Sequence, residues 1–283
     1  MNQLLNGRAM REFDLEISAG LSEKNYWEDL WRYRELFYFL AWRDILVRYK
    51  QTVVGIAWAL IRPFVAMVVF TVILGKLAKL PSGGVPYPIL VFCGLLPWQL
   101  FSNSFAESGN SIIANSSLIT KIYFPRLIVP AASVVVGFLD FLISCIFLGV
   151  LLLWYGFLPD WRIFAMPVFA LIAAFMSFGV GLLFAALTVK YRDFRFVVPF
   201  VVQFGLYVTP VGFSSEIVPE KWRLLYSLNP LVGVINGFRW AILRGRTPLD
   251  LPGFSVSLAV VAGVVLLGVW YFRKTERTFA DVI

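Results

Sequence analysis

Residues 116–130, SSLITKIYFPRLIVP, separate two long apolar runs, and the interpretation of the whole chain starts from them. Two cations, two aromatic rings and a proline lie at their centre: Lys121, Tyr123, Phe124, Pro125 and Arg126. A proline prevents an unbroken helix from running through, so the stretch is unsuited to crossing a membrane. We interpret it as a short cytoplasmic segment that presses on another protein. The alternative is an ordinary charged turn between two spanning helices.

The composition indicates an integral membrane protein. Hydrophobic residues make up 59% of the 283-residue chain and charged residues only 15%, whereas a soluble domain carries about a quarter charged residues. Membrane spans would use most of this length, so we expect one membrane domain and no separate soluble domain. The net charge of +8 fits cytoplasmic loops that face anionic lipid, and we expect no nucleic-acid partner.

Several kinds of chemistry are excluded by residues that the sequence lacks. There is no histidine, and Cys93 and Cys145 both fall inside apolar runs, which gives neither a disulfide framework nor a metal site. No GxxxxGK[ST] motif occurs, so the chain does not bind and hydrolyse ATP through a phosphate loop. The first twenty residues are polar and show no cleavable signal peptide. We therefore expect no cofactor in this chain.

The chain is predicted to be all-α, with four successive regions. Residues 1–24 form a cytoplasmic N-terminal lead, 25–52 an amphipathic interface helix, 53–272 a six-span membrane domain and 273–283 a cytoplasmic tail. Asn25 and Glu28 have the spacing of a capping box, which starts the second region. Its mixture of aromatic and charged residues favours a helix in the membrane plane. A cytoplasmic helix packed on a partner is the alternative.

The six predicted spans follow from apolar runs of about 20 residues. They cover residues 53–74, 88–105, 128–154, 163–189, 196–213 and 252–272. Lysine and arginine concentrate before the first span, in 116–126, in the KYRDFR loop 190–195 and in the tail. The positive-inside rule then places both termini, residues 116–130 and KYRDFR in the cytoplasm.

Residues 214–250 hold two apolar pieces separated by Asn229-Pro230, and neither piece is long enough to cross a bilayer. Because such breaks are tolerated at membrane depth only inside protein or along a cavity, we predict a re-entrant hairpin entering from the outer side. A surface-lying loop with amphipathic helices is the alternative.

Three charges fall in or beside the spans: Arg62, Glu107 and Asp140. A charge deep in a span is costly unless it is paired or wet, and Asp140 without a second carboxylate is a poor proton relay. We predict that Asp140 forms an ion pair with a neighbouring cation, for which Arg62 is the candidate.

Aromatic residues make up 17% of the chain, and most serve membrane belts and core packing. Some rings could instead line a passage and stack on sugar faces. The candidates by position are Trp58, Phe70, Trp98, Phe101 and Tyr207.

Several stretches together resemble the ABC-2 type polysaccharide export permeases, the membrane subunits of exporters for O-antigen, capsule and teichoic acid chains. They are WRDILVRYKQTVVGIAW (42–58), SLITKIYFPRLIVP (117–130), KYRDFR (190–195), TPVGF (209–213), IVPEKWR with LNP (217–230), GFRWAILRG (237–245) and YFRKTERTFADVI (271–283). They extend along the chain in the family's order. The resemblance implies a bacterial inner-membrane subunit that pairs with a second copy, each resting on a separate ATPase that carries ATP and Mg.

The resemblance also assigns roles to residues. The ATPase-coupling set comprises Ile119, Lys121, Tyr123, Phe124, Pro125, Arg126, Lys190, Tyr191, Arg192 and Asp193. The outer gate would include Asn229, Pro230, Phe238 and Arg239. The implied cargo is an undecaprenyl-linked glycan, most directly O-antigen, whose diphosphate would meet Arg43, Arg48 and Lys50; anchoring by the positive-inside rule is the other role for these three.

Two other function classes stay open. An ABC-2 permease for a drug or lipid would have the same plan with another cargo, although the KYRD, FPR and ERTFAD matches argue against it. A membrane glycosyltransferase would need clustered acidic residues for a metal and a sugar nucleotide, and the sequence shows no such cluster.

Overall fold

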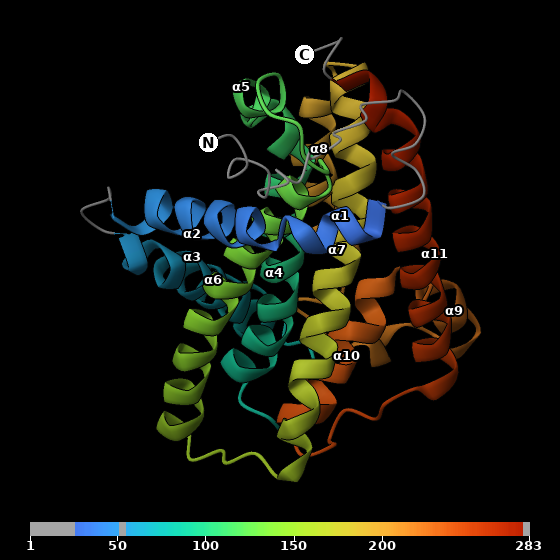
Figure 1. Ribbon diagram of the computed structural model, residues 1–283. Helices are drawn as coiled ribbons and strands as arrows, with labels where there is room; N and C mark the ends of the chain where they lie inside the picture. The colour runs from blue at the N-terminus through green and yellow to red at the C-terminus, as the bar shows by residue number, and fades with distance from the viewer. Residues whose placement is uncertain (1–25, 51–54, 280–283) are drawn as a thin grey trace, which may run out of the picture.

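The computed structural model describes residues 26–50 and 55–279, and within these ranges every regular element is a helix, as the apolar runs predicted. The N-terminal lead 1–24, the proposed cap Asn25 and the last four residues lie outside the described part. Figure 1 shows a bundle of long helices crossed near its middle by a pair of helices from the N-terminal region. The candidate functional site, described below, includes residues from both the bundle and the crossing pair.

The crossing pair consists of α1 (Tyr26–Arg32) and α2 (Arg34–Lys50), which fall within the predicted interface helix. Their direction is transverse to the long helices (Figure 1). Large aromatic side chains such as Trp31 and Tyr38 are 73% and 68% exposed. Exposed rings on a helix beside charged residues suit the interfacial region of a bilayer.

Five segments are long and apolar enough to cross a membrane. They contain α3 (Gly55–Phe70) with η2 (Thr71–Leu77), α4 (Tyr87–Ala114), α6 (Ile128–Trp154), η3 (Trp161–Ala165) with α7 (Met166–Lys190), and α11 (Leu251–Thr275) with η5 (Glu276–Thr278). The remaining predicted span, 196–213, corresponds to α8 (Phe194–Val208), which has only 15 residues. The described helices therefore give five candidate spans and one shorter apolar helix.

Residues 214–250 contain two separate helical pieces with the break where the sequence predicted it. After η4 (Ser215–Ile217) come α9 (Glu220–Tyr226) and α10 (Pro230–Ile242). The Asn229 side chain caps α10 by accepting from the backbone N–H of Leu231 at 3.2 Å. Pro230 follows at the first helical position, where its missing N–H costs nothing.

Arg239 of α10 is fully buried yet has no carboxylate partner among the described residues. Its guanidinium instead donates to the carbonyl oxygens of Val211 at 2.9 Å, Phe213 at 2.7 Å and Leu90 at 3.3 Å. Buried polar groups need such partners, so Arg239 fixes α10 to α4 and to the chain that leaves α8. Helix α10 is thereby part of the bundle.

Helix α4 is the centre of the bundle. In its most apolar window 83% of the residues are buried, whereas only 11% are buried in the first span. Small residues let neighbouring helices approach closely: a Cβ added at Gly137 of α6 would lie 2.1 Å from Ser104 Oγ, and one added at Gly181 of α7 would lie 2.4 Å from Ser108 Oγ. Most of the apolar surface of the first span is not covered by other parts of the described chain.

Glycine also sets the contact between α7 and α11. A Cβ added at Gly268 would lie 2.3 Å from the backbone oxygen of Gly179, so we expect Gly268→Ala to lower the thermal unfolding midpoint in detergent. Gly263→Ala on the same helix is the matched control, because nothing lies within 4 Å of its Cβ and alanine favours a helix by about 1 kcal/mol. Equal midpoints for the two variants would refute this packing.

Candidate functional site

The coupling segment, residues 116–126, has one buried side and one exposed side. It begins as α5 (Ser116–Ile119) and continues through turns into α6. Ile119 and Phe124 are 4% and 3% exposed and insert into a core cluster, whereas Ile122 and Tyr123 are 55% and 70% exposed. The segment therefore presents an apolar and aromatic surface on an anchored base. That geometry suits contact with another protein.

The other predicted coupling residues are distributed over both sides of this surface. Lys121 is exposed, Pro125 is buried and Arg126 is intermediate. At the end of α7 and in the turn to α8, Lys190, Tyr191, Arg192 and Asp193 are all exposed. Figure 1 shows this turn at the same end of the bundle as α5. The predicted coupling residues thus share one end of the molecule.

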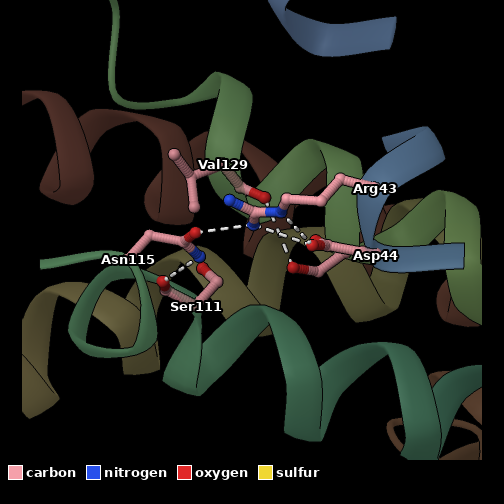
Figure 2. A network of polar contacts seen from close by, with 6 residues as sticks. Arg43, Asp44, Ser111, Asn115 and Val129 are labelled. Carbon is pink, nitrogen blue, oxygen red and sulfur yellow. Dashed lines mark hydrogen bonds and ion pairs between the residues drawn. The ribbon is translucent and has the colours of Figure 1, made fainter. Parts of the chain in front are cut away.

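Arg43 connects the interface helix to the start of the coupling segment (Figure 2). Its Nη2 lies 2.7 Å from Asp44 Oδ1 and 2.7 Å from Asn115 Oδ1. Asn115 ends α4 directly before α5, and its side-chain N–H donates to the Ser111 carbonyl at 2.9 Å. Because Asn115 is held from both sides, the position of α2 and that of the coupling segment are linked.

Arg48 makes a second connection, from the end of α2 into the spans. Its guanidinium forms ion pairs with Glu107 of α4 and, at 2.7 Å, with Asp140 of α6. The Tyr49 hydroxyl also donates to Asp140. Burial, together with that bond, raises the pKa of Tyr49 above its ordinary value, so the hydroxyl remains a proton donor at neutral pH. Two intramembrane carboxylates are thus satisfied by the interface helix.

The predicted Arg62–Asp140 pair is wrong. Asp140 does have a cationic partner, but that partner is Arg48, whose helix crosses beside α4 and α6. Arg62 and Asp140 instead line the same cavity, of about 230 Å³, together with polar groups that include Gln99 and Asn103. The cation that pairs with Asp140 therefore comes from the crossing helix α2 and not from a neighbouring span.

The structure separates the three cations that the resemblance assigned to a lipid diphosphate. Arg43 and Arg48 already have protein oxygens as partners, whereas Lys50 is exposed at the end of α2. A guanidinium shared between carboxylates is less available to an external phosphate. Within this set Lys50 is the most accessible group.

The five candidate channel rings are not equivalent. Trp58 and Tyr207 are 52% and 67% exposed, and Phe70 is half-buried. Trp98 and Phe101 are only 4% and 5% exposed inside the protomer core. Trp98 and Phe101 are therefore not accessible to a ligand in this conformation.

The predicted gate residues lie around the start and the buried face of α10. Asn229 caps the helix and also donates to Thr209 Oγ1 at 3.0 Å, while Pro230, Phe238 and Arg239 are buried.

Three residues that contact the site residues were not predicted from the sequence: Asn115, Tyr49 and Phe279. For Asn115 the only available signal was a polar residue directly before residues 116–126.

Sequence comparison with known proteins identifies the family of this chain. Residues 35–243 match the family model described as ABC-2 type transporter. The chain belongs to that family. It is a transport permease, not an enzyme, and ATP hydrolysis lies in a partner subunit.

Three related proteins align with between 83% and 90% of this chain. It is 30% identical to the O-antigen export system permease protein RfbA of Myxococcus xanthus over 90% of this chain and 98% of that protein. It is 28% identical to a Klebsiella pneumoniae protein of the same name, over 85% of this chain and 92% of the relative. The polysialic acid transport protein KpsM of Escherichia coli is 24% identical over 83% of this chain and 91% of the relative.

A double-mutant cycle tests the Arg48–Asp140 pair. Arg48→Met and Asp140→Asn should each destabilise the protein, because the first leaves Asp140 and Glu107 without the cation they share and the second removes one of the two ion pairs of Arg48 in a poorly solvated place. Their combined cost should fall short of the sum by about 0.5–3 kcal/mol. The measurement is the free energy of unfolding in mixed micelles.

Arg62→Met, combined with the same Asp140→Asn change, is the matched control, since Arg62 lines the cavity without pairing with Asp140. Its coupling to Asp140 should be near zero. A larger coupling for Arg62 than for Arg48 would contradict the assignment.

Proposed function

We propose that this chain is the membrane-spanning subunit of an exporter that moves lipid-linked polysaccharide, most directly O-antigen, across the bacterial inner membrane. The names of the relatives supply the cargo class, and the near-complete coverage of both chains supports a common task. The observation that carries the mechanism is the coupling segment, whose buried Phe124 and exposed Tyr123 form an anchored contact surface. The sequence contains no phosphate loop, so force reaches the chain by contact with the ATPase.

The proposed topology has six spans with both termini in the cytoplasm. Helix α8 serves as the fifth span together with the residues up to 213, and α9–α10 form a re-entrant hairpin from the outer side. Support for the hairpin comes from the buried side of α10, where Arg239 satisfies carbonyl groups that lipid could not. The predicted gate residues, among them Phe238, would act at this hairpin.

The proposed assembly contains two copies of this chain and two copies of the ATPase. The first span is 11% buried, which leaves a large apolar face for lipid or a second copy. Trp58 and Tyr207 are the predicted ring contacts that remain accessible for a glycan. Lys50 is the proposed contact for the diphosphate of an undecaprenyl carrier, at the inner end of the path.

A second candidate cargo is a capsular polysaccharide. The similarity to the polysialic acid transport protein, at 24% identity over most of both chains, is the observation that favours it. Export of a supplied capsular chain in place of an O-antigen chain, by the reconstituted complex, distinguishes the two.

Replacing Ile122 and Tyr123 together by alanine tests the contact surface. Both side chains are exposed, so the variant should remain inserted and folded while its affinity for the ATPase drops about tenfold, which is about 1.4 kcal/mol. ATP-driven transport of lipid-linked glycan in proteoliposomes should fall accordingly at limiting ATPase. Binding is measured by titrating the ATPase against the permease in nanodiscs.

The matched control changes Trp161 and Phe164 to alanine, two rings of 71% and 83% exposure in η3, at the opposite end of α7 from Lys190. It should retain the wild-type affinity for the ATPase. Unchanged binding and transport in the Ile122/Tyr123 variant would show that coupling occurs elsewhere.

A further inference from the structure

The last residue that the structure describes, Phe279, lies on the buried side of the coupling segment. Phe279 is fully buried, and its ring contacts Phe272 in a T-shaped arrangement with centroids 5.3 Å apart. It belongs to the same core cluster as Ile119 and Phe124. The Arg126 guanidinium lies 5.9 Å from the centroid of the Phe279 ring. One aromatic ring from the tail thus supports the coupling segment from its buried side.

The start of α1 holds the same tail from another direction. The Tyr26 hydroxyl donates to Glu276 Oε2 at 3.0 Å, and the Arg273 guanidinium lies 4.2 Å from the Tyr26 ring centroid. Tyr26 is only 6% exposed. Figure 1 shows α1 reaching across the bundle to α11. Three segments distant in sequence therefore meet at one place: α1, the coupling segment and η5.

The coupling segment has little structure of its own to keep its shape. Its helix α5 has four residues, and the following residues are turns and bends up to α6. An isolated turn of helix is marginal without tertiary contacts. The position of its exposed side chains therefore depends on what its buried residues contact.

We propose that residues Glu276–Phe279 of the tail, together with Tyr26, form a clasp. This clasp is a set of contacts that positions the coupling segment against the ATPase. This inference rests on the proposed function. Phe279 shares a buried cluster with Phe124 and lies under the Arg126 guanidinium, and the Tyr26–Glu276 bond holds Glu276–Phe279 in place. Tyr26 and Phe279 are positioning residues: they act through the segment and do not meet the cargo. When the clasp is loosened, the ATPase still binds and hydrolyses ATP, but its movement is transmitted poorly.

A merely structural role for Phe279 would lower stability without changing the number of ATP molecules hydrolysed per glycan moved. We therefore take that ratio as the readout, measured with the full permease and its ATPase in proteoliposomes. Phe279→Ala should raise the ratio about tenfold, because small misplacements of working groups can cost that much in rate. Phe279→Leu, which refills most of the space, should restore it.

The matched control is Phe92→Ala, which removes an equally buried phenylalanine from α4 in the other core cluster. It should lower the thermal unfolding midpoint and leave the ratio unchanged. Tyr26→Phe retains the ring and removes only the bond to Glu276, so it tests the clasp even where Phe279→Ala fails to fold. It should raise the ratio about twofold or more, since a single buried hydrogen bond is lost.

A wild-type ratio in Phe279→Ala or, where that variant does not fold, in Tyr26→Phe overturns the clasp. An equal rise in Phe92→Ala also overturns it, since the effect would then be general destabilisation. Failure of the proposed function gives a different result, because the wild-type complex itself would move no lipid-linked glycan with ATP.

Discussion

The guanidinium of Arg48, shared by Asp140 and Glu107, is the interaction on which the rest of the arrangement depends. Carboxylates on membrane-spanning helices are costly unless a cation or a donor meets them. Here the cation comes from a helix that does not span, and Tyr49 of the same helix completes the shell of Asp140. Glu107 on α4 and Asp140 on α6 therefore fix the position of the end of the interface helix, where Arg48 and Tyr49 lie. Removing Arg48 would leave both carboxylates without the cation that they share.

The interface helix is attached at two points that serve different parts of the molecule. Near its middle Arg43 contacts Asn115, directly before the coupling segment, and near its end Arg48 contacts the spans. A displacement of the coupling segment is thus shared with α2, and through α2 with α4 and α6. Hydrogen bonds of this kind, in which at least one partner is charged, are stronger than bonds between neutral groups.

Much of the fold follows from apolar run length, and its exceptions have physical causes. Residues 128–154 were predicted as a span and form α6 with those bounds. The run 88–105 was predicted too short, because polar residues such as Glu107 continue inside α4 where protein partners satisfy them. Only part of the run 196–213 is helical, since α8 ends before Thr209, where the backbone becomes extended. Hydropathy measures transfer to lipid and does not register partners within the protein.

The site was less predictable than the fold. Composition located the coupling segment but could not show that Phe124 is buried while its neighbour Tyr123 is exposed, because a stretch of turns has no periodicity to interpret. The partner of Asp140 was misassigned because depth along two spans suggested Arg62, whereas the crossing of α2 is a tertiary feature. The burial of Phe279 under the segment joins residues more than 150 positions apart. Long-range contacts of this kind leave no local pattern.

The central claim is that the exposed surface of the coupling segment faces the cytoplasm and is covered by the ATPase. It is tested most directly by labelling an Ile122→Cys variant with a membrane-impermeant maleimide in inside-out and right-side-out vesicles, with the wild-type chain as the blank. The account predicts labelling only in inside-out vesicles, and protection when the ATPase is bound. Labelling from the outer side, or equal labelling with and without the ATPase, would contradict it.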